Sequence, residues 1–204
     1  MKPPACRLIA LALPLAFGLC FGFTTRGGRG ADKEDDEAKA ARDGVLRLTD
    51  ALEKKDAAAA KKQVADLANK VGEVENVMAL FGPRKGDKGG LGVGPTAGAI
   101  KPDGIEKKLE VLGDNAPTAE ALAKEAGALT RMAYNTAAIA LLAEAVPNAK
   151  GKAARKTWEG YAQVTYAASL QLAEAVGAKD AGKVKTTAMR VGLGCTACHE
   201  KFRD

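Results

Sequence analysis

Two cysteines and the only histidine of the chain stand together near the C-terminus, as Cys195-Thr196-Ala197-Cys198-His199. This C-x-x-C-H spacing is the pattern through which c-type haems are attached to proteins. Two thiols one helical turn apart can add to the two vinyl groups of a haem, and the adjacent imidazole can then bind the iron as its proximal ligand. The pentapeptide therefore predicts one covalent haem c per chain, attached through Cys195 and Cys198, with His199 on the iron.

The same thiols allow other chemistries, which the rest of the sequence disfavours. A disulfide between residues three apart on a helix would close a small, strained loop. A structural zinc site needs four ligands, and without its leader the chain has only two cysteines and one histidine. Thiol redox chemistry remains an alternative because C-x-x-C is also the thioredoxin-like motif, although no strand is predicted before it.

Residues 1–30 are typical of a secretory signal peptide. A basic start precedes an apolar run from Leu8 to Phe23, which is sixteen residues long and contains Pro14. That run is short for a membrane-spanning helix, which needs about 20 apolar residues. A lipid anchor on Cys20 is the weaker interpretation, because Leu19 occupies the position where such signals have a small residue. We therefore expect a periplasmic protein with no stable membrane span in the mature chain.

Removal of the leader also changes the charge and the cysteine content. The full chain carries a formal charge of +6, and four of its cations lie in residues 1–30, where there is no acidic residue. The mature chain is therefore only weakly basic, which argues against nucleic acid as a partner. Cys6 and Cys20 leave with the leader, so Cys195 and Cys198 are the only thiols expected in the mature protein.

The mature chain, residues 31–204, has the size of one domain and the composition of a helical one. Apolar residues recur at alternating steps of three and four, which predicts helices that pack as a bundle. This pattern appears in Val64, Leu67, Val71, Val74, Met78 and Phe81. The expected helices are Glu37–Lys54, Ala57–Phe81, Thr118–Ala145, Lys152–Val176 and Asp180–Phe202, with a shorter one at Ile105–Leu112.

A segment rich in glycine and proline, Gly82–Gly104, separates the second long helix from the third. It is not a Walker A loop, because no G-K-[ST] ends it, and it is not a dinucleotide fingerprint, because no strand precedes it. Two interpretations remain: a flexible crossover between helices, or a flap over one face of the haem.

The C-terminal segment Val191–Arg203 resembles the end of the class II c-type cytochromes, the cytochrome c′ and cytochrome c556 family. The shared features are the C-x-x-C-H near the chain end, an alanine before the second cysteine and the pair Phe202-Arg203 just after it. The preceding helix, with Trp158 and Tyr161, is also similar to the penultimate helix of that family. The likeness covers about the last 55 residues.

This resemblance implies an all-α, antiparallel four-helix bundle with a haem buried at one end, here extended by an additional helix and the Gly-rich loop. It also implies that Arg203 lies near the haem, where it contacts a propionate or remains a solvated cation at a helix C-terminus. For Trp158 and Tyr161, core packing is favoured over a haem-facing role. A homodimer is a further expectation, since family members are often dimers.

Three functions are compatible with these residues. The first is an exported electron-transfer cytochrome that carries single electrons between redox partner proteins. The second is a high-spin, cytochrome c′-like protein that binds NO or CO at an open distal face. The third is a thiol oxidoreductase without haem. We expect no enzymatic activity, because no second histidine is present to act as a distal acid or base.

The sixth iron ligand distinguishes the first function from the second. Met189 lies ten residues before His199 on the same predicted helix, about 15 Å along its axis, and Met132 is also expected to be out of range. Met78 lies one turn from the end of the second predicted helix. Residues 51–57 (ALEKKDA) and 175–181 (AVGAKDA) match in register, either through duplication or because the two turns have equal length. The match predicts that the first helical hairpin lies parallel to the last one. The end of the second predicted helix would then lie at the haem.

We therefore expect Met78 as the distal ligand, and with it electron transfer. An open or leucine-blocked distal face is the main alternative, with lysine or water as further ones. Methionine is also an ordinary filler of hydrophobic cores, and Met78 completes the apolar pattern of its own helix.

Overall fold

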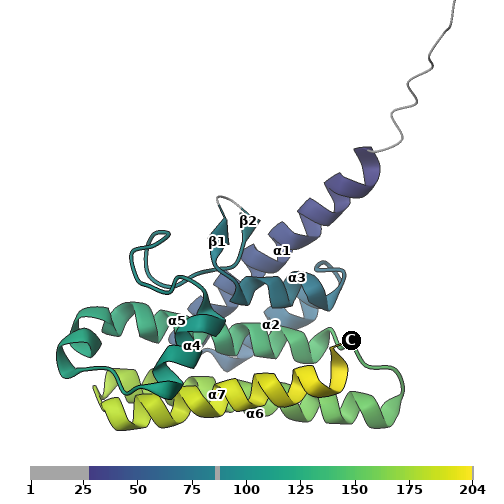
Figure 1. The fold of residues 1–204 in the computed structure, drawn as a ribbon. Helices are drawn as coiled ribbons and strands as arrows, with labels where there is room; N and C mark the ends of the chain where they lie inside the picture. Colours follow the sequence, from purple (N-terminus) through teal and green to yellow (C-terminus); the bar gives the residue numbers. More distant parts are fainter. Residues whose placement is uncertain (1–27, 86–87, 204) are drawn as a thin grey trace, which may run out of the picture.

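The computed structural model describes residues 28–85 and 88–203 (Figure 1). Nearly all of the predicted signal peptide, including Cys6 and Cys20, lies outside the described residues. The helices are α1 (Gly28–Glu53), α2 (Ala57–Ala68), α3 (Val74–Met78), α4 (Ile105–Asp114), α5 (Ala119–Ala145), α6 (Lys152–Gly177) and α7 (Ala181–Phe202). A 3₁₀ turn, η1 (Ala79–Phe81), and a two-residue hairpin, β1 (Arg84–Lys85) and β2 (Lys88–Gly89), complete the elements. The predicted all-α class is confirmed.

Local capping signals explain why α5 and α7 begin where the sequence predicted them. The hydroxyl of Thr118 accepts a hydrogen bond from the amide of Ala121 at the start of α5. The carboxylate of Asp180 does the same for the amide of Lys183 in α7, at 2.9 Å. Such caps satisfy amides that have no partner within the helix, and Pro147 follows directly after α5 has ended.

The turn between α1 and α2 repeats the turn between α6 and α7, 124 residues later. Lys55 and Lys179 adopt the same left-handed conformation, with φ of 58° and 55°. The amides of Asp56 and Asp180 each donate to the carbonyl five residues earlier, at 2.9 and 3.1 Å. The match seen in the sequence therefore extends to the backbone of the two turns.

The prediction of one continuous helix over Ala57–Phe81 is wrong. The helix ends at Ala68, the chain passes Gly72 with a φ of +67°, and helix resumes at Val74. A side chain at Gly72 would collide with the carboxylate of Glu37 on α1. Because glycine tolerates both this backbone conformation and this close approach, the chain can turn here and lay α3 against α5.

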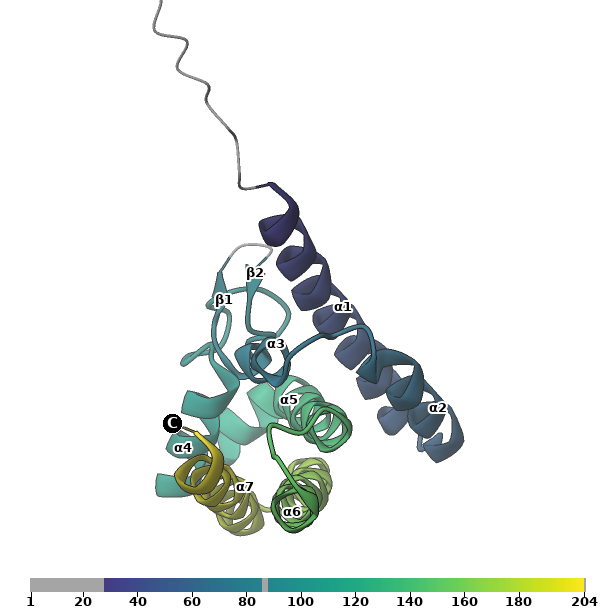
Figure 2. The ribbon, with the colours of Figure 1, turned by 90° about the vertical axis from the view of Figure 1, so that its right-hand side faces the viewer.

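The helices α5, α6 and α7 form two successive hairpins, so that each runs antiparallel to the next (Figure 1). Figure 2 shows these three nearly end-on, with α1 crossing obliquely on the far side of α5. The short helix α4 lies along α7, where Gly113 permits the close contact. A Cβ atom at Gly113 would lie 3.1 Å from the Cα of Met189.

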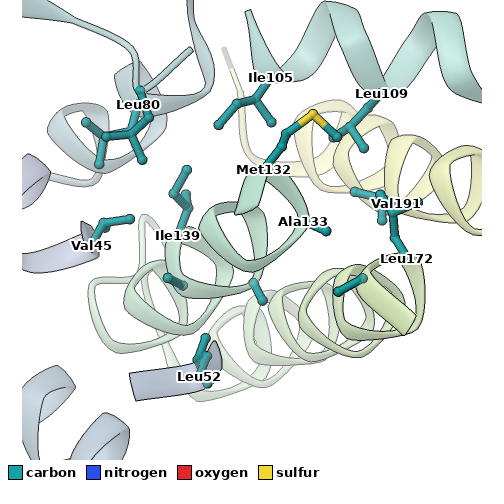
Figure 3. Close-up of a cluster of buried hydrophobic side chains, with 14 of the residues drawn as sticks. Val45, Leu52, Leu80, Ile105, Leu109, Met132, Ala133, Ile139, Leu172 and Val191 are labelled. Carbon is teal, nitrogen blue, oxygen red and sulfur yellow. The ribbon is translucent and has the colours of Figure 1, made fainter. Parts of the chain in front are cut away.

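One continuous core joins these elements (Figure 3). Fully buried Leu48, Leu129, Ile139 and Leu172 are among its largest side chains. Two polar contacts, one buried and one half-buried, tie the outer helices to α5. The hydroxyl of Thr49 on α1 lies 2.9 Å from the amide oxygen of Asn135, and the ammonium of Lys108 on α4 pairs with Glu125 at 2.7 Å.

The Gly-rich segment is organised around one half-buried ion pair. The Arg84 guanidinium donates to the carbonyl of Leu91 at 2.7 Å and to the carboxylate of Asp103 at 3.3 Å. Asp103 also accepts from the backbone amides of Arg84 and Val93. These contacts shape the connection between η1 and α4. In the described part of the chain, no helix is both long and apolar enough to cross a membrane.

Candidate cofactor site

A cavity of about 750 Å³ lies where α3, α4 and α7 meet the end of α5 and the first turns of α6. Its volume is within the range of roughly 300–1,000 Å³ that is usual for cofactor sites. The lining includes Met78, Cys195, Cys198, His199 and Arg203. The structure thus brings all five residues that the sequence predicted as haem contacts to one cavity.

Four of these residues belong to the C-terminal end of the chain. Cys198 and His199 lie one turn after Cys195 on α7, and Arg203 follows directly after the helix ends. Gly194 lets α7 approach α6 closely, because a Cβ atom there would lie 2.8 Å from the hydroxyl of Thr165. This close approach sets the distance between α6 and the part of α7 that carries Cys195 and Cys198.

An aromatic cluster fixes the last turn of α7. Phe202 packs edge-on against Trp158 and Tyr161 of α6, with ring centroids 5.3 and 6.4 Å apart. The indole nitrogen of Trp158 donates to the carbonyl of Ala143 on α5 at 2.7 Å. Core packing, the favoured interpretation for Trp158 and Tyr161, holds for Trp158, which is buried in the core. Tyr161 is half-buried and packs on Phe202 outside that core, and both residues line the cavity.

The two thiols are unpaired, and both are harder to ionise than an ordinary cysteine. Burial raises the pKa of Cys195 to about 11, helped by the negative charge of Glu106. Burial likewise raises the pKa of Cys198. Both thiols are therefore protonated near neutral pH, whereas thioredoxin-like sites depend on a lowered cysteine pKa.

Met78 lines the cavity, but it lies on a different helix from the one predicted. It ends the short helix α3, which lies above α7 in the view of Figure 1, and residues of both helices line the cavity. Met78 is half-buried, and Glu75 lies one turn before it on the same lining. Met132 is fully buried in the core and does not line the cavity. Met189 does line it, on the same helix as His199.

Several lining residues had no role in the sequence-based expectation. Met189 and Leu193, one turn apart on α7, are 47% and 62% exposed although both are apolar. Glu106 and Glu110 face the cavity from α4. Their spacing of four residues would have placed them on one helix face, but only the packing of α4 against α7 turns that face toward the cysteines.

None of the described residues between 82 and 104 lines the cavity. The Gly-rich segment instead contacts α1, where Arg42 donates to the carbonyl of Gly90 at 3.1 Å. A flap formed by this segment therefore does not cover the cavity.

Comparisons with protein-family models, with curated protein sequences and with solved structures gave no match. The site is therefore interpreted from its own residues and geometry, together with the resemblance carried by the C-terminal segment.

Proposed function

We propose that this protein is an exported c-type cytochrome whose single covalent haem carries electrons between redox partner proteins. The observation that carries the proposal is the convergence of both thiols of C-x-x-C-H, its histidine and Met78 on one cavity of cofactor size. The iron of a bound haem would supply the one-electron chemistry, by alternating between its ferric and ferrous states. The predicted signal peptide supports a periplasmic location.

The walls of the cavity suit a large, flat, mainly apolar group. Met189 and Leu193 expose apolar surface to the cavity that no other part of the described chain covers. Covering such surface is favourable, and a porphyrin held beside Cys195 and Cys198 would do so. The raised pKa of both thiols supports this use of the cysteines over a thiol–disulfide exchange role.

The four-helix bundle of the resemblance corresponds best to α4, α5, α6 and α7. The Gly113 contact sets α4 beside α7, and the Lys108–Glu125 pair ties it to α5. In this assignment α1, which contacts α5 from outside, is the additional helix. We also propose that the protein forms a homodimer and that it exchanges electrons with redox partner proteins.

Met78 is our candidate for the distal ligand, because it lines the cavity from α3, whereas His199 lines it from α7. The test is the optical spectrum of the ferric and ferrous holoprotein, with Met78→Leu and Met189→Leu as a matched pair. Methionine ligation predicts a sulfur-to-iron charge-transfer band that Met78→Leu abolishes and Met189→Leu retains.

A high-spin ferric spectrum in the unmutated protein, together with rapid binding of CO to the ferrous form, would exclude Met78 as a ligand. It would favour the alternative function, the binding of NO or CO at an open distal face. A protein purified from the periplasm without any haem absorbance would contradict both functions.

A further inference from the structure

Among the described residues, the cavity lining carries four carboxylates, of which Glu106, Glu110 and Asp114 lie on α4 and Glu75 lies on α3. Glu110 is also paired with Lys107 at 2.6 Å. Tyr161 and Asn148, from α6 and from the α5–α6 connection, contribute hydrogen-bond donors near the end of α7. In Figure 1, α4 lies over the first half of α7, whereas the α5–α6 connection and the C-terminal end of α7 are both at the opposite side of the view.

The side chains of these donors have no partner among the described residues and are free to bind a ligand. Within the described part of the chain, the side chains of Tyr161, Asn148 and Arg203 make no hydrogen bond or ion pair with another residue, and all three line the cavity. The Phe202 ring, next to Arg203 in the sequence, packs on Tyr161 and holds the end of α7 against α6. Three unpaired donors on the lining of one cavity suit an anionic group of the ligand.

We propose that Tyr161 and Asn148, together with Arg203, bind the two propionate carboxylates of the haem, and that the carboxylates of α4 prevent the opposite orientation. This inference rests on the proposed function. Arg203 was expected near a propionate from the family resemblance alone, whereas Tyr161, Asn148 and the direction of the haem follow from this cavity.

The structure of haem agrees with an orientation in which its propionates point toward Tyr161, Asn148 and Arg203. Its vinyl groups and its propionates lie on opposite edges of the porphyrin, so the thioether edge and the anionic edge point to different ends of the cavity. The charge of Glu106 acts on Cys195, which sets the acidic wall beside the thioether edge. Propionates at that wall would meet like charges, whereas at the donor end they accept charge-assisted hydrogen bonds.

The first test is the reduction potential of the holoprotein as a function of pH. Donors that stabilise ionised propionates keep their pKa low, so the potential of the unmutated protein should be constant over about pH 5–8. In a Tyr161→Phe/Asn148→Ala/Arg203→Gln variant the propionate pKa rises into that range. The potential should then fall as pH rises, because ionised propionates stabilise ferric iron. Tyr166→Phe/Arg155→Gln is the matched control and should behave as the unmutated protein.

The second test uses two probes, haemin and haemin dimethyl ester, and the full chain with Cys195→Ala/Cys198→Ala. Haemin should bind roughly tenfold more tightly than its ester, and the preference should disappear with Tyr161→Phe/Arg203→Gln. Equal affinity for both probes, or an unchanged pH profile in the triple variant, would overturn the inference while leaving the proposed function intact. A protein that binds neither covalent haem nor haemin would overturn both.

Discussion

The ring of Phe202 stands edge-on to the indole of Trp158, with their centroids 5.3 Å apart and their planes at 74°. This contact joins the last turn of α7, three residues after His199, to the second turn of α6. Because both rings also line the cavity, Trp158 reports directly on what occupies it.

Trp158 is the only tryptophan of the chain, which makes its fluorescence specific for this cavity. A haem attached to Cys195 and Cys198 would lie against the same wall and quench the indole emission by energy transfer. We expect strong quenching in the holoprotein and bright emission from the haem-free chain produced without its leader. Equal emission from the two forms would show that the haem lies elsewhere.

Gly113 is expected to be required for the packing of α4 against α7. A methyl group at this position would lie 3.1 Å from the Cα and 3.2 Å from the backbone nitrogen of Met189, and this backbone cannot yield without separating the helices. We expect Gly113→Ala to lower the free energy of unfolding by about 1–2 kcal/mol. Urea denaturation of the holoprotein measures the change.

Gly160→Ala on α6 is the matched control, because nothing lies within 4 Å of a Cβ atom at that position. Alanine is the better helix former, so this substitution should stabilise the protein by up to about 1 kcal/mol. A stabilising effect of both substitutions would contradict the close contact between α4 and α7.

The reactivity of Cys195 in the haem-free protein should follow its raised pKa. The thiolate is the reactive form, so a pKa of about 11 in place of the usual 9.0 should slow alkylation near pH 8 about a hundredfold relative to the unfolded chain. The rate should rise as pH approaches 11. Alkylation by iodoacetamide, followed by peptide mass analysis, measures the rate at this cysteine.

Glu106→Gln should accelerate that alkylation at a given pH, because it removes a negative charge that raises the pKa of Cys195. Glu110→Gln, on the same face of α4, is the control and should leave the rate unchanged. If the two variants behave alike, the charge of Glu106 does not act on the thiol.

The sequence predicted most of the helical structure, since its signals are local. Caps at Thr118 and Asp180 and the stop at Pro147 need only neighbouring residues to act. The break between α2 and α3 could not be seen, because Gly72 lies inside an unbroken apolar pattern and its role depends on Glu37 of a distant helix. The order of the Gly-rich segment likewise depends on Arg84 and Asp103, nineteen residues apart.

The candidate site was predictable where it follows one helix, and not where it needs several. The face of Cys195, Cys198 and His199 follows from helical periodicity alone. Met78 lines the same cavity as predicted, but through α3 and not through the end of one long helix. The acidic wall could not be predicted, because Glu106 faces the cysteines only once α4 lies along α7.

The most direct test of the central claim is the intact mass of the denatured protein after expression with its leader in a host that attaches haem c. We predict the mass of the mature chain plus one haem, and the same absorbance of bound haem after denaturing electrophoresis. Cys195→Ala/Cys198→Ala should lose this covalent addition. A mass equal to that of the polypeptide alone, from cells that attach haem to a control cytochrome, would contradict the account.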